Sequence, residues 1–255
     1  MPTGQVGAKP GPLFAAAGTW EVEMVGKGGH AAAGIGAGVV DPVVAASNAV
    51  TQLQSIISRN LLPWDKGVVS VTMFHAGDAY NVIPSSVVFG GTIRAFSRET
   101  YNLIEQRAKT IIQNTAEAFG CTVKMSFTSF DDDCLEGNGT PSHFPSGCTY
   151  PAVLNDPEAY ELSKGAAKSL FGPEHVVEAE ATLGGEDFAY FAEKTPSSFM
   201  FVGIGNETKG TTAGLHSPNF KLDEEALPIG AALHVATALH ALQELSGLKG
   251  PSAEL

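Results

Sequence analysis

Hydrophobic and polar positions settle into a regular pattern from Thr19 onward. The segment Trp20–Met24 alternates apolar residues with two glutamates, which is the two-residue period of a strand with one buried face. Apolar residues at helical spacing then begin at Asp41-Pro42, where the aspartate suits the N-cap and the proline the first turn, and they stop by Pro63. The pattern predicts a strand followed by an amphipathic helix.

Strand and helix patterns continue to alternate downstream. Two β-branched runs, Val68–Phe74 and Val87–Ile93, predict neighbouring strands joined by a turn. A helix with Ser97 as N-cap and Gly120 as its terminating glycine comes next, and Val123–Phe127 alternates as a fourth strand. The order strand, helix, strand, strand, helix, strand is that of a split βαβ, ferredoxin-like domain.

The rest of the chain shows a less complete pattern. Residues 1–18 are rich in Gly, Pro and Ala and are expected to be an incoming connection, and residues 129–155 indicate a linker. The further expected elements are helices at 157–170 and 224–245, a strand at 198–204, a short segment at 176–181 and a helix opening at Glu186-Asp187-Phe188. Two full helices and one strand do not enclose a sheet core, so we expect this second body to lack part of its structure.

Composition narrows the possible partners. The chain has 255 residues, of which 44% are hydrophobic and 16% charged, a globular mixture. Its net charge of −12 disfavours nucleic acid and anionic membranes, because neither gains from a negative field. No apolar run near the roughly 20 residues of a membrane span is evident, and the N-terminus shows no secretory signal. A soluble protein of the cytoplasm or an organelle lumen is expected.

The three cysteines, Cys121, Cys134 and Cys148, lack the spacing of a zinc knuckle and are odd in number. We therefore expect free structural thiols. Pairing of Cys134 with Cys148 across the intervening loop is the alternative.

Three polar residues of the first domain occupy positions suited to chemistry. His30 lies in a glycine-rich turn after a strand, Asn81 in a turn between two strands, and Arg94 in an otherwise apolar strand. Polar loop residues are enriched at functional sites, and a guanidinium in a strand either pairs with an acid or awaits a ligand carboxylate. A plain turn histidine, hairpin asparagine and surface arginine fit the same pattern.

Three further candidates lie downstream. Glu186 and Asp187 open an expected helix, where carboxylates cap the first amides and interact favourably with the helix dipole. His216 lies in a loop before the last helix. A neutral imidazole is a common metal ligand, although one histidine alone is not a metal site.

Seven stretches occur in an order and spacing that resemble one protein family. They are Gly29–Ala32, Asp41–Ala46, Asn81–Pro84, Gly91–Arg94, Gly185–Phe188, Leu215–Pro218 and Gly230–His234. Over nearly its whole length the chain is similar to the metallopeptidase clan of aminoacylases and carboxypeptidase G. Within that clan it most resembles the branch of plant auxin-conjugate (indole-3-acetyl-amino-acid) hydrolases and bacterial N-acyl-amino-acid amidohydrolases.

The resemblance implies an α/β fold in which a ferredoxin-like (βαββαβ) dimerisation lid interrupts a zinc-peptidase-like catalytic domain. Residues 19–130 correspond to the lid, and residues 1–18 with 131–255 to the catalytic-domain remainder. It also implies a homodimer that hydrolyses the amide bond of N-acyl amino acids with two divalent metals, Mn or Zn. The family's Cys-Gly-His-Asp segment, catalytic Glu-Glu pair and a further metal-binding His lie upstream of the matching region. The chain is therefore expected to be truncated and inactive alone.

The resemblance assigns roles to the three lid residues. His30 matches a histidine that crosses the dimer interface and supports the oxyanion in the partner's active site. Asn81 and Arg94 match residues that hold the carboxylate of the substrate. Many members carry a second histidine shortly after the first, whereas residues 31–38 here are only Ala, Gly and Ile. This departure puts the contribution of a second imidazole in doubt.

The resemblance also covers the downstream candidates. Glu186 and Asp187 match a motif at the pocket wall, and His216 matches the last of five metal ligands. The alternative function is a non-catalytic dimerisation or binding module derived from the family. A nucleotide-binding domain is disfavoured because no strand–GxGxxG–helix unit with a downstream acidic residue is present.

Overall fold

The computed structural model describes residues 1–33, 36, 38–130 and 148–246. Its contacts divide the chain into two compact units, which are described separately below. Unit 1 comprises Met1–Leu13, Val153–Thr182 and Phe188–Leu255, and unit 2 comprises Phe14–Ala152 and Leu183–Asp187.

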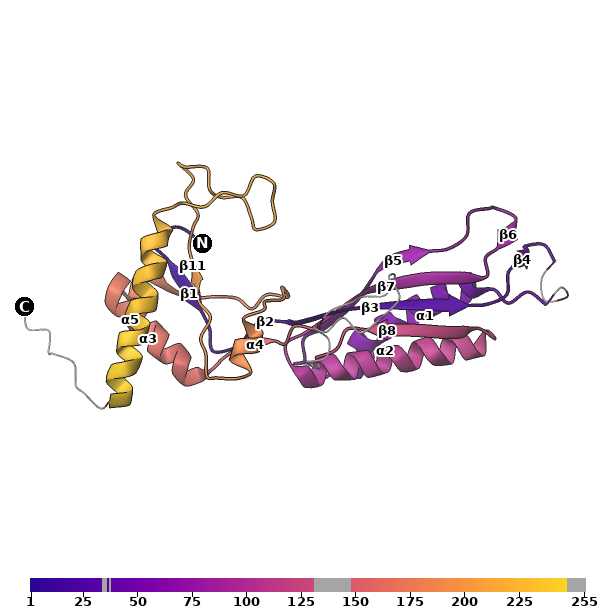
Figure 1. Ribbon diagram of the computed structural model, residues 1–255, viewed down its shortest axis with the longest axis horizontal. Coiled ribbons are helices and arrows are strands. Elements are labelled where there is room, and N and C mark those ends of the chain that lie inside the picture. The colour runs from indigo at the N-terminus through magenta and orange to yellow at the C-terminus, as the bar shows by residue number, and fades with distance from the viewer. Residues whose placement is uncertain (34–35, 37, 131–147, 247–255) are drawn as a thin grey trace, which may run out of the picture. The chain divides into compact units, whose positions relative to one another are not determined.

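Unit 2 is built on a four-stranded antiparallel sheet with the strand order β5-β7-β3-β8 (Figure 1). Its elements in chain order are β3 (Ala16–Val25), α1 (Pro42–Ser55), which continues into the π-helix η2 (Ile56–Asn60), β5 (Gly67–His75), β7 (Ser86–Ala95), α2 (Arg98–Ala118) and β8 (Thr122–Phe127). The two helices contact each other and the sheet. The order of elements is the one that the hydrophobic periodicity predicts.

Local chemistry fixes where these helices begin. Asp41 caps α1, since its Oδ1 accepts hydrogen bonds from Val43 N at 2.8 Å and from Val44 N at 3.3 Å. Ser97 caps α2 by accepting from Thr100 N at 3.1 Å. Each cap satisfies N–H groups that have no partner inside the helix, which stabilises it by about 1 kcal/mol.

One face of the unit 2 sheet carries the hydrophobic core. Val22 and Ile93 are fully buried there, together with Leu53 of α1. Trp20 stacks on Phe127 with ring centroids 5.9 Å apart. Burial of each such large side chain contributes about 1.5–3 kcal/mol, so this core is the main source of stability for unit 2.

Two short strands, β4 (Gly29–His30) and β6 (Val82–Ile83), form a separate antiparallel ribbon. Figure 1 shows this ribbon beyond one end of the unit 2 sheet. His30 pairs directly with Val82. Two turns that lie far apart in the sequence are therefore one structural feature.

Unit 1 is built on a three-stranded sheet with the order β10-β1-β11. Its elements are β1 (Val6–Ala8), α3 (Pro157–Phe171), the 3-10 helix η4 (Pro173–His175), β10 (Val176–Glu178), α4 (Ala189–Ala192), β11 (Phe201–Val202) and α5 (Ala226–Ser246). Strands β2 (Gly11–Phe14) and β9 (Val153–Asn155) form a further two-stranded pair, and both come between β1 and α3 in chain order. The core joins Val6, Ala167 and Leu233.

One expectation for unit 1 is wrong, and another is confirmed only in part. Residues 1–18 are more than a connection, because β1 is the central strand of the sheet and Val6 is fully buried. Long-range pairing with β10 and β11 creates this strand, and three residues are too few to show a period. The strand expected at 198–204 contains only Phe201 and Val202, since β11 pairs with β1 over just two positions.

Cys148 is disulfide-bonded, so the expectation of three free thiols is wrong. A parallel backbone bridge joins Ser129 and Cys148. Cys121 is free and buried, as expected. Cys134 lies outside the described residues.

Helix α5 is long and apolar enough, by length and composition, to cross a membrane, although no such run was expected from the sequence. One such helix is weak evidence for a span, because the core helix of a soluble protein meets the same criterion. Its large exposed apolar side chains are Leu227, Val235, Leu239 and Leu242.

Candidate functional site

His30 and Asn81 meet at the tip of the β4–β6 ribbon. The Ala31 N–H donates to the Asn81 carbonyl at 3.0 Å, and both candidate side chains are exposed. The Ala32 N–H donates to His30 Nδ1 at 3.2 Å. A nitrogen that accepts a hydrogen bond carries no proton, so Nε2 of the neutral ring bears it. His30 therefore presents an N–H donor to the solvent.

Arg94 lies at the other end of β7 from this ribbon. β7 begins at Ser86, just after β6, and Arg94 is its penultimate residue. Eight residues of extended strand span about 26 Å at roughly 3.3 Å per residue. His30 and Arg94 of one chain therefore do not converge on the same small molecule.

The Arg94 side chain borders a cavity of about 460 Å³ in unit 2. Its lining residues are Ala17, Gly18, Thr19, Arg94, Thr128, Cys148, Tyr150 and Gly185. Arg94 is half-buried, and within the described parts of the chain it forms no ion pair with a carboxylate. A cation in this condition is available to an anionic ligand.

Residues 183–187 reach the same cavity. The Ala15 N–H donates to the Gly184 carbonyl at 3.1 Å. A Cβ on Gly185 would lie 2.7 Å from Ala17 Cβ and 3.1 Å from Arg94 Nη1, so this close approach requires glycine. The structure thus brings Gly185 of this motif and Arg94 together within unit 2.

Glu186 and Asp187 of this motif both precede the helix that they were expected to open. The expected helix begins only at Ala189, lasts four residues and has Phe188 as its N-cap, with no side-chain hydrogen bond to the helix. Glu186 is half-buried and Asp187 exposed. The expected helix start at Glu186 is wrong because the helix begins only at Ala189, so neither carboxylate lies in its first turn, and the pocket-wall interpretation stays a prediction.

A buried cluster of hydroxyl groups borders the cavity, since Thr128 lines it, and the sequence analysis did not predict this cluster. Thr128 Oγ1 and Thr149 Oγ1 are 2.9 Å apart, and Tyr101 OH lies 3.4 Å from Thr149 Oγ1. Burial raises the pKa of Tyr101, and the hydrogen bond with Thr149 opposes this effect. The three residues come from separate segments, so no local pattern in the sequence announces the cluster.

His216 belongs to unit 1 and has an unusual backbone. Its φ is +62°, and it is the only non-glycine residue of the described ranges with a positive φ. The Ser217 N–H donates to the Gly214 carbonyl at 3.3 Å, so His216 is the third residue of a tight turn, a position that favours glycine. Its imidazole is exposed. Strained residues of this kind are frequent at functional sites.

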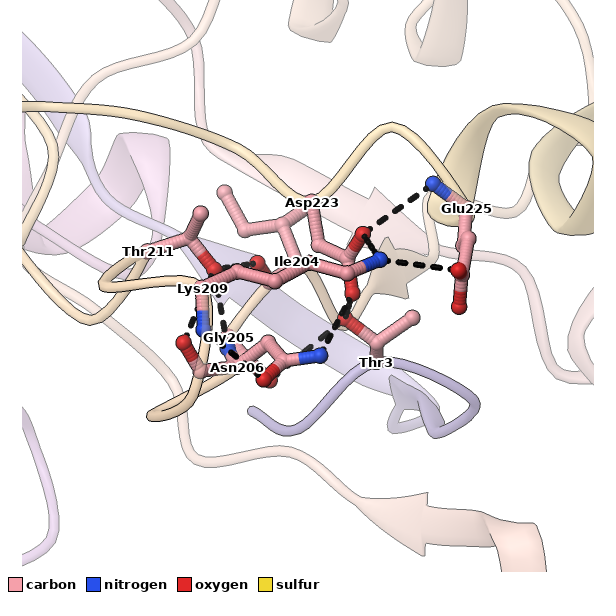
Figure 2. Close-up of polar contacts among 8 residues, drawn as sticks. All are labelled: Thr3, Ile204, Gly205, Asn206, Lys209, Thr211, Asp223 and Glu225. Carbon is pink, nitrogen blue, oxygen red and sulfur yellow. Dashed lines mark hydrogen bonds and ion pairs between the residues drawn. The ribbon is translucent and has the colours of Figure 1, made fainter.

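The loop that carries His216 ends at a buried carboxylate, Asp223 (Figure 2). Its Oδ1 accepts from Lys209 Nζ at 2.7 Å, and its Oδ2 accepts from Asn206 Nδ2 at 3.0 Å and from Thr3 Oγ1 at 3.1 Å. The Lys209 ammonium, followed by the Asn206 amide, holds the pKa of the Asp223 carboxyl far below its usual range. Asp223 is therefore ionised at any ordinary pH.

A larger cavity of about 1040 Å³ lies in unit 1 beside the same loop. Phe201, Leu215 and Phe220 give it an apolar lining, and Glu178 and Glu180 add acidic groups. Within the described ranges no group of three or more His, Cys, Asp or Glu side chains is placed to hold a metal ion. The assignment of His216 as a metal ligand therefore stays a prediction.

Comparison with known proteins places this geometry in context. The model of peptidase family M20/M25/M40 matches residues 19–240. IAA-amino acid hydrolase ILR1-like 4 of Arabidopsis thaliana is 35% identical over 95% of this chain and 51% of its own length. N-acetylcysteine deacetylase of Bacillus subtilis (strain 168) is 33% identical over 96% of this chain and 57% of its own length.

Two solved structures are similar to this chain in both fold and sequence. A Staphylococcus aureus structure matches with a TM-score of 0.78 and 30% identity, over 94% of this chain and 56% of the other. The Bacillus subtilis YXEP protein, described as a dinuclear metal binding peptidase from the M20 family, matches with a TM-score of 0.68 and 28% identity, over 96% of this chain and 55% of the other. The chain thus spans about half the length of the relatives it matches. The match along residues 19–240 shows that the chain belongs to peptidase family M20/M25/M40.

Proposed function

We propose that this chain supplies the lid and the C-terminal catalytic segment of a metal-dependent amidohydrolase that cleaves the amide bond of N-acyl amino acids. The separation of His30 and Asn81 from Arg94 along β7 carries the proposal. An active site that needs all three side chains must take them from two copies of the chain. Relatives named for hydrolysis of amino acid conjugates and for deacetylation of an amino acid support the substrate class.

Residues 19–130 form the ferredoxin-like lid in this proposal, and two lids pair to make a homodimer. The strand order β5-β7-β3-β8, with helices between the first and second and between the third and fourth strands in sequence, supports the lid assignment. Strand β5 lies at an edge of the sheet, and its Met73 and Phe74 are exposed. An edge with exposed apolar residues is a favourable surface for a second copy.

Each candidate side chain then has a defined task. His30 of one protomer donates its Nε2–H to the oxyanion that develops on the amide carbonyl in the partner's site. Arg94 binds the free carboxylate of the amino-acid half through its planar fork of donors. The amide of Asn81, delivered on the same ribbon as His30, assists in holding the substrate.

The metal requirement is met only in part by these residues. Divalent metals, two per complete site, supply a water nucleophile of near-neutral pKa when bound. The exposed imidazole of His216 is a suitable nitrogen ligand for Mn or Zn, and the described residues offer no cluster that completes the coordination. The remaining ligands are proposed to come from the part of the family's length that this chain does not span.

Exposed apolar surface on α5 supports the proposal that further protein completes the catalytic domain. Leu227, Val235, Leu239 and Leu242 are each more than half exposed. Four large apolar side chains along one helix are a surface that favours burial against further protein. We propose that the upstream half of the catalytic domain covers it.

A second candidate function is a non-catalytic dimerisation module that retains the family fold. The lack of a three-ligand metal cluster among the described residues favours it. A coding sequence upstream that contains the family's Cys-Gly-His-Asp segment and Glu-Glu pair would exclude this candidate.

The proposal is tested in the complete enzyme, in which the upstream half of the family's length precedes this chain. His30→Ala is expected to lower kcat for an N-acyl amino acid by about 10²–10³, the effect of removing one oxyanion donor, with the metal content unchanged. His175→Ala, which removes an exposed imidazole from η4, outside the ribbon and outside the β5 edge, is the matched control. Equal loss of metal and turnover in His30→Ala would refute the oxyanion role.

A further inference from the structure

The two ends of the loop between β11 and α5 are hydrogen-bonded to each other. The Asp223 N–H donates to the Ile204 carbonyl at 3.1 Å, which closes the loop at its base. The same carbonyl accepts from Thr211 Oγ1 at 2.9 Å, and Thr211 Oγ1 in turn accepts from Asn206 N at 2.8 Å. Residues 204–211 are therefore a fixed turn, and the loop departs from it toward His216.

The Asp223 carboxylate connects this base to two other segments. Figure 2 shows the side chain between Thr3 of the N-terminal segment, Asn206 and Lys209 of the loop, and Glu225 at the start of α5. Its Oδ1 also accepts from Glu225 N at 3.3 Å, and its side chain is only 1% exposed. A buried carboxylate with several donors is costly to replace, because each donor loses its partner.

The outer part of the loop has little to hold it in place. The hydrogen bonds shown there are local: Ser217 N to the Gly214 carbonyl, Phe220 N to the Ser217 carbonyl, and Asn219 N to Ser217 Oγ. Leu215 is 72% exposed and His216 is exposed. A left-handed non-glycine residue persists only where the surrounding structure over-determines it. The Gly214–Ser217 turn gives His216 its left-handed backbone, and the anchored ends of the loop are what fix where that turn lies.

We infer that Asp223 is a positioning residue for His216: by joining the two ends of the loop through Asn206 and Lys209, and by binding Thr3 of the N-terminal segment, it fixes where the turn that carries His216 lies. The functional meaning rests on the proposed function, in which His216 is a metal ligand. The structural statement stands without it.

The test uses hydrogen exchange and NMR of the 255-residue chain with isotope-labelled histidine. Asp223→Asn keeps the size of the side chain but removes its charge and replaces one acceptor by a donor. We expect amide exchange in residues 205–222 to become at least about tenfold faster, because the anchored ends open more often. The His216 Cα and Cβ resonances should move toward values typical of a flexible loop.

Asp156→Ala is the matched control. Asp156 caps α3, since it accepts from Glu158 N at 3.0 Å and from Ala159 N at 2.9 Å, just as Asp223 accepts from Glu225 N before α5. Asp156 is not bonded to the His216 loop through its side chain in the described structure. The control should speed exchange in α3 and leave the His216 resonances unchanged.

Lys209→Met keeps the proposal testable if Asp223→Asn does not fold. Lys209 is 43% exposed and contributes one of the bonds to Asp223, so we expect a folded protein with loop exchange faster by about threefold. Folded Asp223→Asn or Lys209→Met with unchanged His216 resonances and loop exchange would overturn the proposal and leave Asp223 as a helix cap.

Failure of the proposed function would show elsewhere. No metal is present in these measurements, so they report on the loop alone. If His216→Ala leaves the metal content of the complete enzyme unchanged, the ligand role of His216 is wrong, whatever the loop experiment gives.

Discussion

Removal of the Arg94 guanidinium tests how the substrate carboxylate is held. Arg94 has no ion-pair partner in the described structure and borders a cavity of about 460 Å³. A charge-assisted hydrogen bond contributes about 1.5–3 kcal/mol, which corresponds to about a 10- to 150-fold change in affinity. Arg94→Ala should therefore raise KM for an N-acyl amino acid by that factor. The free energy of unfolding should change by less than about 0.5 kcal/mol, because no buried interaction is lost.

The assay compares two substrates in the complete enzyme, an N-acyl amino acid and its C-terminal amide. Wild-type enzyme should prefer the acid, and Arg94→Ala should lose most of this preference while Arg94→Lys keeps part of it. Arg98→Ala is the matched control, since it removes the same charge from the exposed first residue of α2. An unchanged preference for acid over amide in Arg94→Ala refutes the carboxylate role.

Three further predictions concern the chain itself. Gly18→Ala should lower the free energy of unfolding by about 1–3 kcal/mol, measured with urea, because its methyl group would overlap the Tyr101 hydroxyl; Gly214→Ala, with open space around it, should have little effect. Because the pKa of Tyr101 is raised in the folded state, its contribution to the free energy of unfolding is fully present below pH 10.0, the ordinary pKa, and is lost as pH rises through the folded pKa. Tyr101→Phe should flatten this alkaline loss of stability in urea titrations, whereas Tyr80→Phe, at an exposed position, should not. The purified 255-residue chain should hold no stable dinuclear centre, and two tightly bound metal ions per chain by elemental analysis would contradict the ligand inventory.

The regular part of unit 2 was predictable from the sequence. Alternation at Trp20–Met24 marks a strand whose buried face is decided locally. Asp41 and Ser97 were recognised as N-caps because a cap acts on amides two or three residues away. Gly120, with φ +74°, ends the second helix as expected. These features depend on neighbours in sequence, which a single chain reveals.

The remainder depends on contacts between distant segments. Strand β1 exists because Val6 pairs with both Val176 and Val202, and neither partner can be recognised from the N-terminal residues. Thr3 and Asn206 meet Asp223 for the same reason. Such contacts leave no period in the sequence.

The candidate site likewise combines features that the sequence predicts with features that depend on contacts between distant segments. His30, Asn81, Arg94 and His216 could be selected by residue type and family motif, but the proximity of His30 to Asn81 and of Arg94 to Gly185 could not. Both arise from the folded ribbon and sheet. The distance between them along β7 emerged only with the structure.

The central claim, an active site shared between two copies, is tested most directly by mixing two inactive variants of the complete enzyme. In a mixed dimer of His30→Ala with Arg94→Ala, a shared site makes one position intact and the other doubly defective. Because half of the randomly mixed two-fold dimers combine both chains, the account predicts recovery of about a quarter of wild-type activity at substrate concentrations well below KM. If each site took both residues from one chain, every position would carry a defect, and activity that stays at the level of the separate variants would contradict the account.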